Sequence, residues 1–126
     1  MPFSEDIYKL AKDNSNFRKV LYTSKYSQLV LMSIPPQGEI GEEVHPATDQ
    51  IFYFVGGEGE AILDGVTSQV AEKQVVFVPA NTKHNFVNSG QVDLKLFTIY
   101  APPAHRDGVV HATKQQAEAD ETDHPY

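Results

Sequence analysis

Short runs of apolar residues, several of them alternating with polar ones, recur along the chain after about residue 17. Strands with one buried face alternate in this way, and the β-branched and aromatic residues that strands favour concentrate in the same runs. The runs that predict strands are 19–22, 28–34, 50–55, 60–63, 67–70, 75–78, 84–87 and 92–100. The pattern is therefore typical of an all-β protein.

Clusters of Gly, Pro, Asn and Asp separate these runs and indicate turns at 35–38, 56–57, 64–65 and 88–90. Regularly repeated turns of this kind are typical of a β-sandwich or β-barrel. Asp64-Gly65 predicts the tightest hairpin, because both residues tolerate the positive φ angles of a two-residue turn. The glycine-rich stretch 56–59 also predicts a hairpin turn, rather than a phosphate-binding loop.

The two ends of the chain lack the strand pattern. Ser4 predicts the N-cap of a short helix over 4–11. Near the other end, 113–119 predict one or two helical turns and 120–126 a frayed acidic end. We therefore divide the chain into an N-terminal helical segment over 1–16, a barrel over 17–103 and a C-terminal tail over 104–126.

Three of the five histidines lie dispersed in this tail, at His105, His111 and His124. Their dispersal predicts surface side chains rather than metal ligands. His105 and Arg106 are also candidates for a proton donor or a substrate anchor near the mouth of the barrel.

The composition supports one globular domain, since 126 residues with 40% hydrophobic and 21% charged side chains can bury one core. The net charge of −7 and the presence of only two arginines argue against a nucleic acid partner. The longest apolar runs are far shorter than the roughly 20 residues of a membrane-spanning helix, and the first residues lack signal-peptide features. The sequence has no cysteine, which excludes disulfides and thiolate metal sites and fits the cytoplasm, where we expect the protein.

Four side chains with nitrogen or oxygen ligand atoms carry the candidate chemistry: Glu43, His45, Gln50 and His84. Residues i and i+2 of a strand point to the same face. Glu43 and His45 can therefore reach one point inside a barrel, while Glu42 and Val44 face outward.

The other two candidates come from different parts of the chain. Gln50 opens a predicted strand, with Asp49 beside it as an alternative ligand. His84 follows a turn in which Asn81 can adopt a left-handed conformation before the next strand begins.

The residues around His84 resemble the second signature motif of the cupin family, a family of small β-barrels with jelly-roll topology. That motif has a Pro, a turn Gly, a His and an Asn, and its counterparts here are Pro79, Asn81, His84 and Asn88. Asn81 replaces the Gly, which a left-handed turn accepts. Lys73 stands where the family has another Gly, in a turn outside the site.

The first motif of the family has His-x-His and then a Glu that lies seven residues before a Gly. Counting back from Gly57 places Gln50 at the Glu position, His45 at the second His position and Glu43 at the first. The resemblance implies an all-β jelly-roll (cupin) β-barrel with a short N-terminal helix and an irregular C-terminal tail.

The resemblance also implies a divalent metal ion bound by Glu43, His45, Gln50 and His84. Imidazole, carboxylate and amide oxygen ligands favour Mn²⁺, Fe²⁺, Co²⁺, Ni²⁺ or Zn²⁺. We expect Glu43 and Gln50 to take part in catalysis, with Gln50 as the weakest ligand. Three aromatic residues share strand parity with the ligands and can line an apolar pocket for a small molecule or fill the core: Phe52, Phe54 and Phe86.

We expect a metalloenzyme that acts on a small organic substrate. Cupins include dioxygenases, isomerases, decarboxylases and lyases, and the two-His, one-carboxylate composition favours a dioxygenase-like oxidoreductase. The alternatives are a non-catalytic barrel that binds or senses a small molecule, and a chiefly structural dimerisation barrel. We expect a homodimer, formed through sheet edges and exposed apolar strand surface near 19–34.

Overall fold

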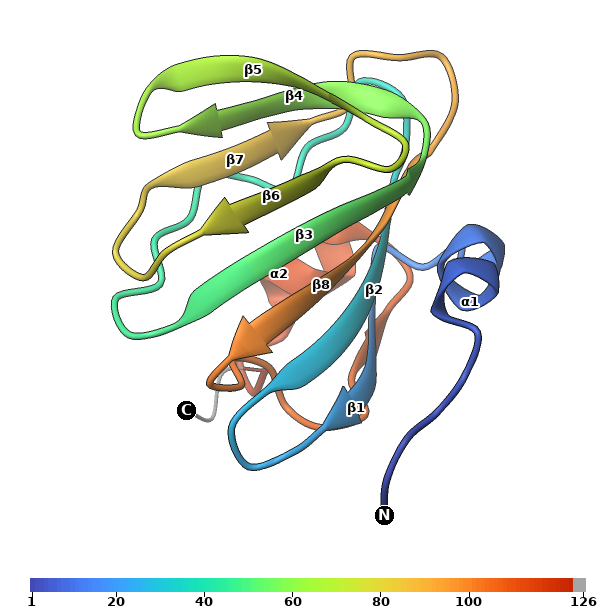
Figure 1. The fold of residues 1–126 in the computed structure, drawn as a ribbon, viewed down its shortest axis with the longest axis vertical. Helices are drawn as coiled ribbons and strands as arrows, with labels where there is room; N and C mark the ends of the chain where they lie inside the picture. Colours follow the sequence, from blue (N-terminus) through green and yellow to red (C-terminus); the bar gives the residue numbers. More distant parts are fainter. Residues whose placement is uncertain (124–126) are drawn as a thin grey trace.

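A computed structural model describes residues 1–123 (Figure 1). Two short helices and nine strands make up the described chain. Their bounds are α1 Ile7–Asp13, β1 Arg18–Thr23, β2 Gln28–Ile34, β3 Asp49–Gly56, β4 Glu58–Leu63, β5 Val66–Ala71, β6 Val75–Val78, β7 His84–Val87, β8 Leu94–Ala101, β9 Val110–His111 and α2 Lys114–Ala119. Each of the eight predicted strands is confirmed, and three have the predicted bounds.

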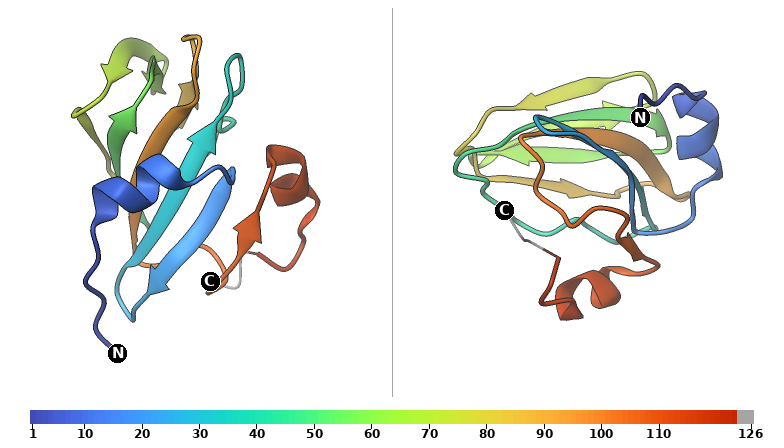
Figure 2. Two further views of the ribbon diagram at one scale, coloured as in Figure 1. Left: turned by 90° about the vertical axis from the view of Figure 1, so that its right-hand side faces the viewer. Right: turned by 90° about the horizontal axis from the view of Figure 1, so that it is seen from below.

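The strands form two antiparallel sheets that face each other (Figure 2). One sheet has six strands in the order β6-β3-β8-β2-β1-β9, and the other has three in the order β5-β4-β7. β8 joins two parts of the larger sheet, because it pairs with β2 on one side and β3 on the other. This arrangement confirms the predicted jelly-roll fold.

The main hydrophobic core fills the space between the sheets. β8 shows how strand parity builds it: four alternate side chains are buried, namely Leu94, Leu96, Thr98 and Tyr100. The same period of two points Gln50, Phe52 and Phe54 of β3 inward. The first inward position of β3, Gln50, and the last two of β8, Thr98 and Tyr100, are polar, and they lie together beside the candidate site.

α1 covers the outer face of the six-stranded sheet, where Ala11, Leu31 and Val55 form a second, smaller core (Figure 2). Ser4 was the predicted N-cap of this helix, and this prediction is wrong. Asp6 is the N-cap, because its Oδ1 accepts a hydrogen bond from the Lys9 backbone N–H at 3.1 Å.

The strands near 19–34, where we expect the dimer contact, are partly covered within the chain. β9 pairs with the free edge of β1, and β2 lies between β1 and β8. α1 packs on the outer face of β2 at Leu31. These contacts cover part of the strands near 19–34, and both the homodimer and its contact surface stay predictions.

The two predicted glycine turns have different outcomes. Asp64 and Gly65 join the paired strands β4 and β5 with φ angles of 48° and 82°, which confirms the tight hairpin. Gly57 does not close a hairpin, because β3 and β4 belong to different sheets. The chain crosses here from one sheet to the other.

Gly57→Ala should lower the free energy of unfolding by at least about 2 kcal/mol. Gly57 has a φ of 84°, and a Cβ atom added here would lie 2.5 Å from the Asp93 carbonyl oxygen. Gly65→Ala is the matched control, because Gly65 has a similar φ of 82° with no atom within 4 Å of the added Cβ. Denaturant unfolding should show a loss of only about 1 kcal/mol for the control. Equal losses would contradict the predicted steric cost.

The tail after β8 packs against the barrel through β9 and α2, and Thr113 caps α2 in agreement with the predicted helical turns. The predicted surface positions of His105 and His111 are wrong, because their exposed fractions are 0% and 4%. Each buried histidine ring is hydrogen-bonded to an acidic side chain: His105 to Asp123, and His111 to Asp120.

The acidic end is consequently not frayed over 120–123. The hydrogen bond with His111 Nε2, at 3.0 Å, lowers the pKa of Asp120 well below its usual range. His124 lies outside the described residues. Neither helix between residues 1 and 123 has the length and apolar character to span a membrane.

Candidate metal centre

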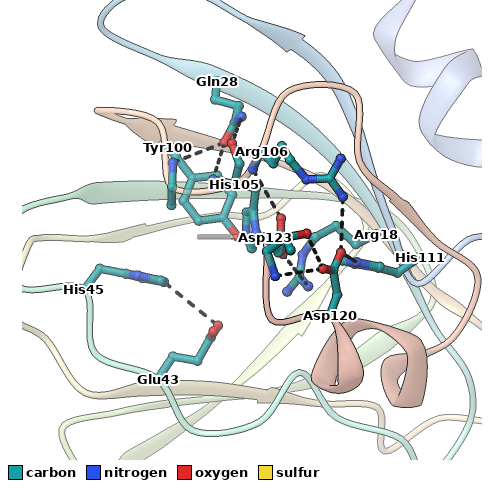
Figure 3. Close-up of polar contacts among 12 residues, drawn as sticks. Arg18, Gln28, Glu43, His45, Tyr100, His105, Arg106, His111, Asp120 and Asp123 are labelled. Carbon is teal, nitrogen blue, oxygen red and sulfur yellow. Dashed lines mark hydrogen bonds and ion pairs between the residues drawn. The ribbon is translucent and has the colours of Figure 1, made fainter. Parts of the chain in front are cut away.

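Three of the four predicted ligands come together at the end of the space between the sheets. One ligand atom each from Glu43, His45 and His84 lie within 4.8 Å of one another. Figure 3 shows the His45 ring directed toward the Glu43 carboxylate, with Nε2 and Oε1 3.9 Å apart. Glu42 and Val44 are exposed, as the alternation predicted.

Backbone hydrogen bonds position these residues, although 41–45 do not form a regular strand. Glu43 and His84 form an isolated antiparallel bridge in which each backbone N–H donates to the carbonyl oxygen of the other at 2.9 Å. Asn81, with a φ of 68°, donates its backbone N–H to the His45 carbonyl oxygen at 2.8 Å. The left-handed turn predicted at Asn81 is confirmed, and it supports the loop that carries His45.

The His84 ring is oriented for binding a ligand inside the barrel. Its Nδ1 lies 2.9 Å from the Thr82 carbonyl oxygen, so Nδ1 carries the proton and donates it. Nε2 is then an acceptor, and it is buried without a hydrogen-bond partner among residues 1–123. An unsatisfied buried acceptor is costly, and metal-binding histidines are commonly held through the other ring nitrogen in this way.

The fourth predicted ligand, Gln50, lies in the inward row of β3, opposite Tyr100 of β8. Its Nε2 donates to Thr98 Oγ1 at 3.1 Å. Its Oε1 is buried and has no hydrogen-bond partner in the described part of the chain. The alternative, Asp49, is exposed and accepts a hydrogen bond from the Ala80 backbone N–H at 2.8 Å.

The three predicted pocket aromatics are fully buried in the core next to the site. The Phe52 ring centroid lies 6.1 Å from that of His84 and 4.2 Å from that of Phe86. Phe54 lies farther along, 5.6 Å from Phe86. The aromatics therefore form a continuous apolar layer that begins at His84.

A buried hydrogen-bonded chain adjoins the three ligands on the other side. The His105 ring contacts the Tyr100 hydroxyl through Nε2 at 3.0 Å and Asp123 Oδ2 through Nδ1 at 2.8 Å (Figure 3). Burial raises the pKa of Tyr100 well above its usual value, so the phenol stays protonated and donates to Nε2. The Tyr100 ring contacts His45 edge-on at 5.8 Å between centroids.

Sequence reasoning missed Tyr100, Asp123 and Arg18. Tyr100 shares strand parity with the buried Thr98, and Arg18 shares it with the buried Val20. Parity therefore carried a signal for the two strand residues. Asp123 had no such signal, because its position depends on the path of the tail.

The donor set fits a divalent ion. Two ligands on opposite sides of one ion lie about 4.2 Å apart, so small side-chain rotations would bring the three atoms, now within 4.8 Å, onto one ion. One carboxylate and two neutral imidazoles suit first-row divalent metals. The group of Glu43, His45 and His84 could therefore hold a metal ion.

Comparisons with known proteins agree with this fold. The family model described as "Cupin domain" matches residues 30–100. YrkC of Bacillus subtilis is 40% identical over 95% of this chain and 68% of its own length. The protein L612 of Acanthamoeba polyphaga mimivirus is 35% identical over 82% of this chain and 68% of its own length. The crystal structure of BH2720 from Bacillus halodurans has a TM-score of 0.94 and 37% identity, covering 95% of this chain and 96% of that one.

Proposed function

The chain belongs to the cupin family, and from that premise we propose that it binds one divalent metal ion through Glu43, His45 and His84 and acts on a small organic molecule. One observation carries the proposal. His84 keeps a buried, unsatisfied Nε2 within reach of a carboxylate and a second imidazole, while its Nδ1 is fixed by Thr82. Among the residues described, this is an acceptor without a protein donor, as a metal ligand requires.

A bound divalent ion would supply Lewis-acid or redox chemistry. Glu43, the carboxylate in the set, would offset part of its charge. Three protein ligands leave coordination positions open, and Gln50 would fill one of them as a neutral ligand that a substrate can displace. The two-His, one-carboxylate composition favours an oxidoreductase of the dioxygenase type over an isomerase or lyase.

The experiment that tests this function is elemental analysis of protein purified without chelator or affinity-column metal. We expect close to one equivalent of Mn, Fe, Co, Ni or Zn per chain, either as purified or after anaerobic addition of each ion. The metal should be lost in His45→Ala and in His84→Ala. His111→Ala is the matched control, because this histidine is buried against Asp120 instead. Absence of metal under every condition would reject the proposal and favour a non-catalytic binding barrel.

A further inference from the structure

A second feature beside the metal ligands points to the kind of molecule that binds. A pocket of about 280 Å³ lies between the start of β1, the segment before Glu43 and helix α2. We call it the Arg18 pocket, and its lining includes Phe17, Arg18, Ile40, Glu43, Lys114 and Asp120. It therefore reaches a proposed metal ligand at the same end as a buried arginine.

Arg18 is buried with most of its hydrogen-bonding capacity unused. Its side chain is 6% exposed, and the nearest carboxylate oxygen, Asp123 Oδ2, is 3.9 Å from Nη1, which is beyond hydrogen-bond distance. Its Nε is buried without a hydrogen-bond partner within 1–123. A guanidinium has five donors in a planar fork that matches a carboxylate, so the geometry of Arg18 calls for an additional anionic acceptor.

The other charged groups of the pocket are either paired with oppositely charged or hydrogen-bonding side chains or exposed to solvent. Lys114 lies 3.8 Å from Glu118 at the exposed rim. Asp120 accepts from Arg106 and from His111. Glu42, which also lines the pocket, is exposed to solvent. These pairs leave Arg18 as the cation that is buried and available at the inner end.

The charges around the inner end also favour an anion once a metal is bound. The ion contributes two positive charges and Arg18 one, while Glu43 and Asp123 contribute one negative charge each. The sum is +1, which one carboxylate neutralises. Buried charges require such compensation, whereas a neutral ligand would leave the excess charge in place.

We propose that the Arg18 pocket binds a small monocarboxylic acid, with its carboxylate on the Arg18 guanidinium and a second oxygen, from a hydroxyl or carbonyl group, directed to the metal site. The proposal rests on the metal site proposed above and names its substrate class. The pocket volume limits the acid to a small one. Arg18 is then a binding residue that touches the substrate.

The test measures acid binding to the Co²⁺-loaded protein by calorimetry and by the visible absorption of cobalt. The probes are glycolate, pyruvate and phenylpyruvate, each compared with its neutral amide. We expect at least one acid to bind more tightly than its amide and to change the cobalt spectrum. Arg18→Gln should weaken binding of that acid by about 10- to 100-fold, with little change for the amide.

Two further variants keep the test decisive. Arg18→Lys retains the charge but lacks the planar fork of donors, so it should lose less affinity than Arg18→Gln. It also keeps the test informative if Arg18→Gln folds poorly. Lys19→Gln, a change of the same charge at the exposed neighbouring position of β1 outside the pocket, should leave affinity within about two-fold. With cobalt bound, failure of all three acids, or equal binding by wild type and Arg18→Gln, overturns the proposal.

The metal-free protein separates this proposal from the metal site. If cobalt fails to bind to the wild type, the proposed function is rejected, and the acids are then titrated against the metal-free chain. Acid binding that is lost in Arg18→Gln would support the anion site in the absence of a metal site. Absence of binding would overturn both proposals.

Discussion

We expect Glu43→Gln to lower the affinity of the protein for Co²⁺ or Zn²⁺ by more than about 100-fold. The change keeps the shape of the side chain but removes the carboxylate from the group of three ligands. Loss of an outer partner of a metal ligand already costs 10- to 100-fold in affinity, so loss of a charged ligand should cost more. Competition with a metal indicator of known affinity measures the difference.

Glu42→Gln provides the matched control for this experiment. Glu42 is adjacent and carries the same charge, but its side chain is exposed. Its replacement should leave metal affinity within about two-fold, since exposed charges interact weakly. Equal losses in both variants would show a general effect of net charge, and no loss in Glu43→Gln would remove Glu43 from the site.

Asp123→Ala should lower the free energy of unfolding at pH 7 by about 3–5 kcal/mol, the range for removing one partner of a buried charge pair. Asp123 is 1% exposed, and it accepts hydrogen bonds from the His105 ring at 2.8 Å and from the Arg106 backbone N–H at 3.2 Å. It also faces the Arg18 guanidinium. Denaturant unfolding measures the loss, and Asp107→Ala, at an exposed position two residues from His105, should cost less than about 0.5 kcal/mol.

The contribution of Asp123 to the free energy of unfolding should decrease as the pH falls. Burial alone would raise the pKa of Asp123, but hydrogen bonds from the His105 ring and the Arg106 backbone N–H, together with the positive charge of Arg18, hold it below the usual 3.8. A carboxyl group with a lowered pKa stabilises the fold above its unfolded pKa and loses that contribution as pH falls through the folded pKa. The difference between wild type and Asp123→Ala should therefore be constant near neutral pH and shrink below about pH 4. A difference that grows on acidification would contradict this account.

The sequence predicts those parts of the fold that depend on local patterns. The strands β2, β6 and β7 match their predicted bounds, because a turn residue directly follows each of them: Pro35, Pro79 and Asn88. The hairpin at Asp64 is local in the same sense. The turn at Gly57 was misread because glycine chemistry indicates a change of direction but does not indicate which sheet the next strand joins.

The candidate site likewise contains residues that the sequence predicts and residues that it does not. Glu43, His45 and His84 could be identified from strand parity and motif spacing, and the structure brings them together. Asp123 was not identified, because it reaches His105 only after the tail has folded back. Arg18 was not identified either: its strand parity with Val20 indicates an inward side chain, but the sequence does not show the pocket beside it.

The position of β8 also determines when during folding the barrel can close. β1 and β2 pair within 16 residues of sequence, but β3 pairs with a strand that begins 38 residues after β3 ends. Contacts so distant in sequence slow folding, because a long loop must be ordered before they form. A ribosome-bound chain that ends before β8 has every proposed metal ligand but lacks the strand that unites β2 with β3. Metal binding that needs the closed barrel should therefore follow the pairing of β8 rather than guide the early steps of folding.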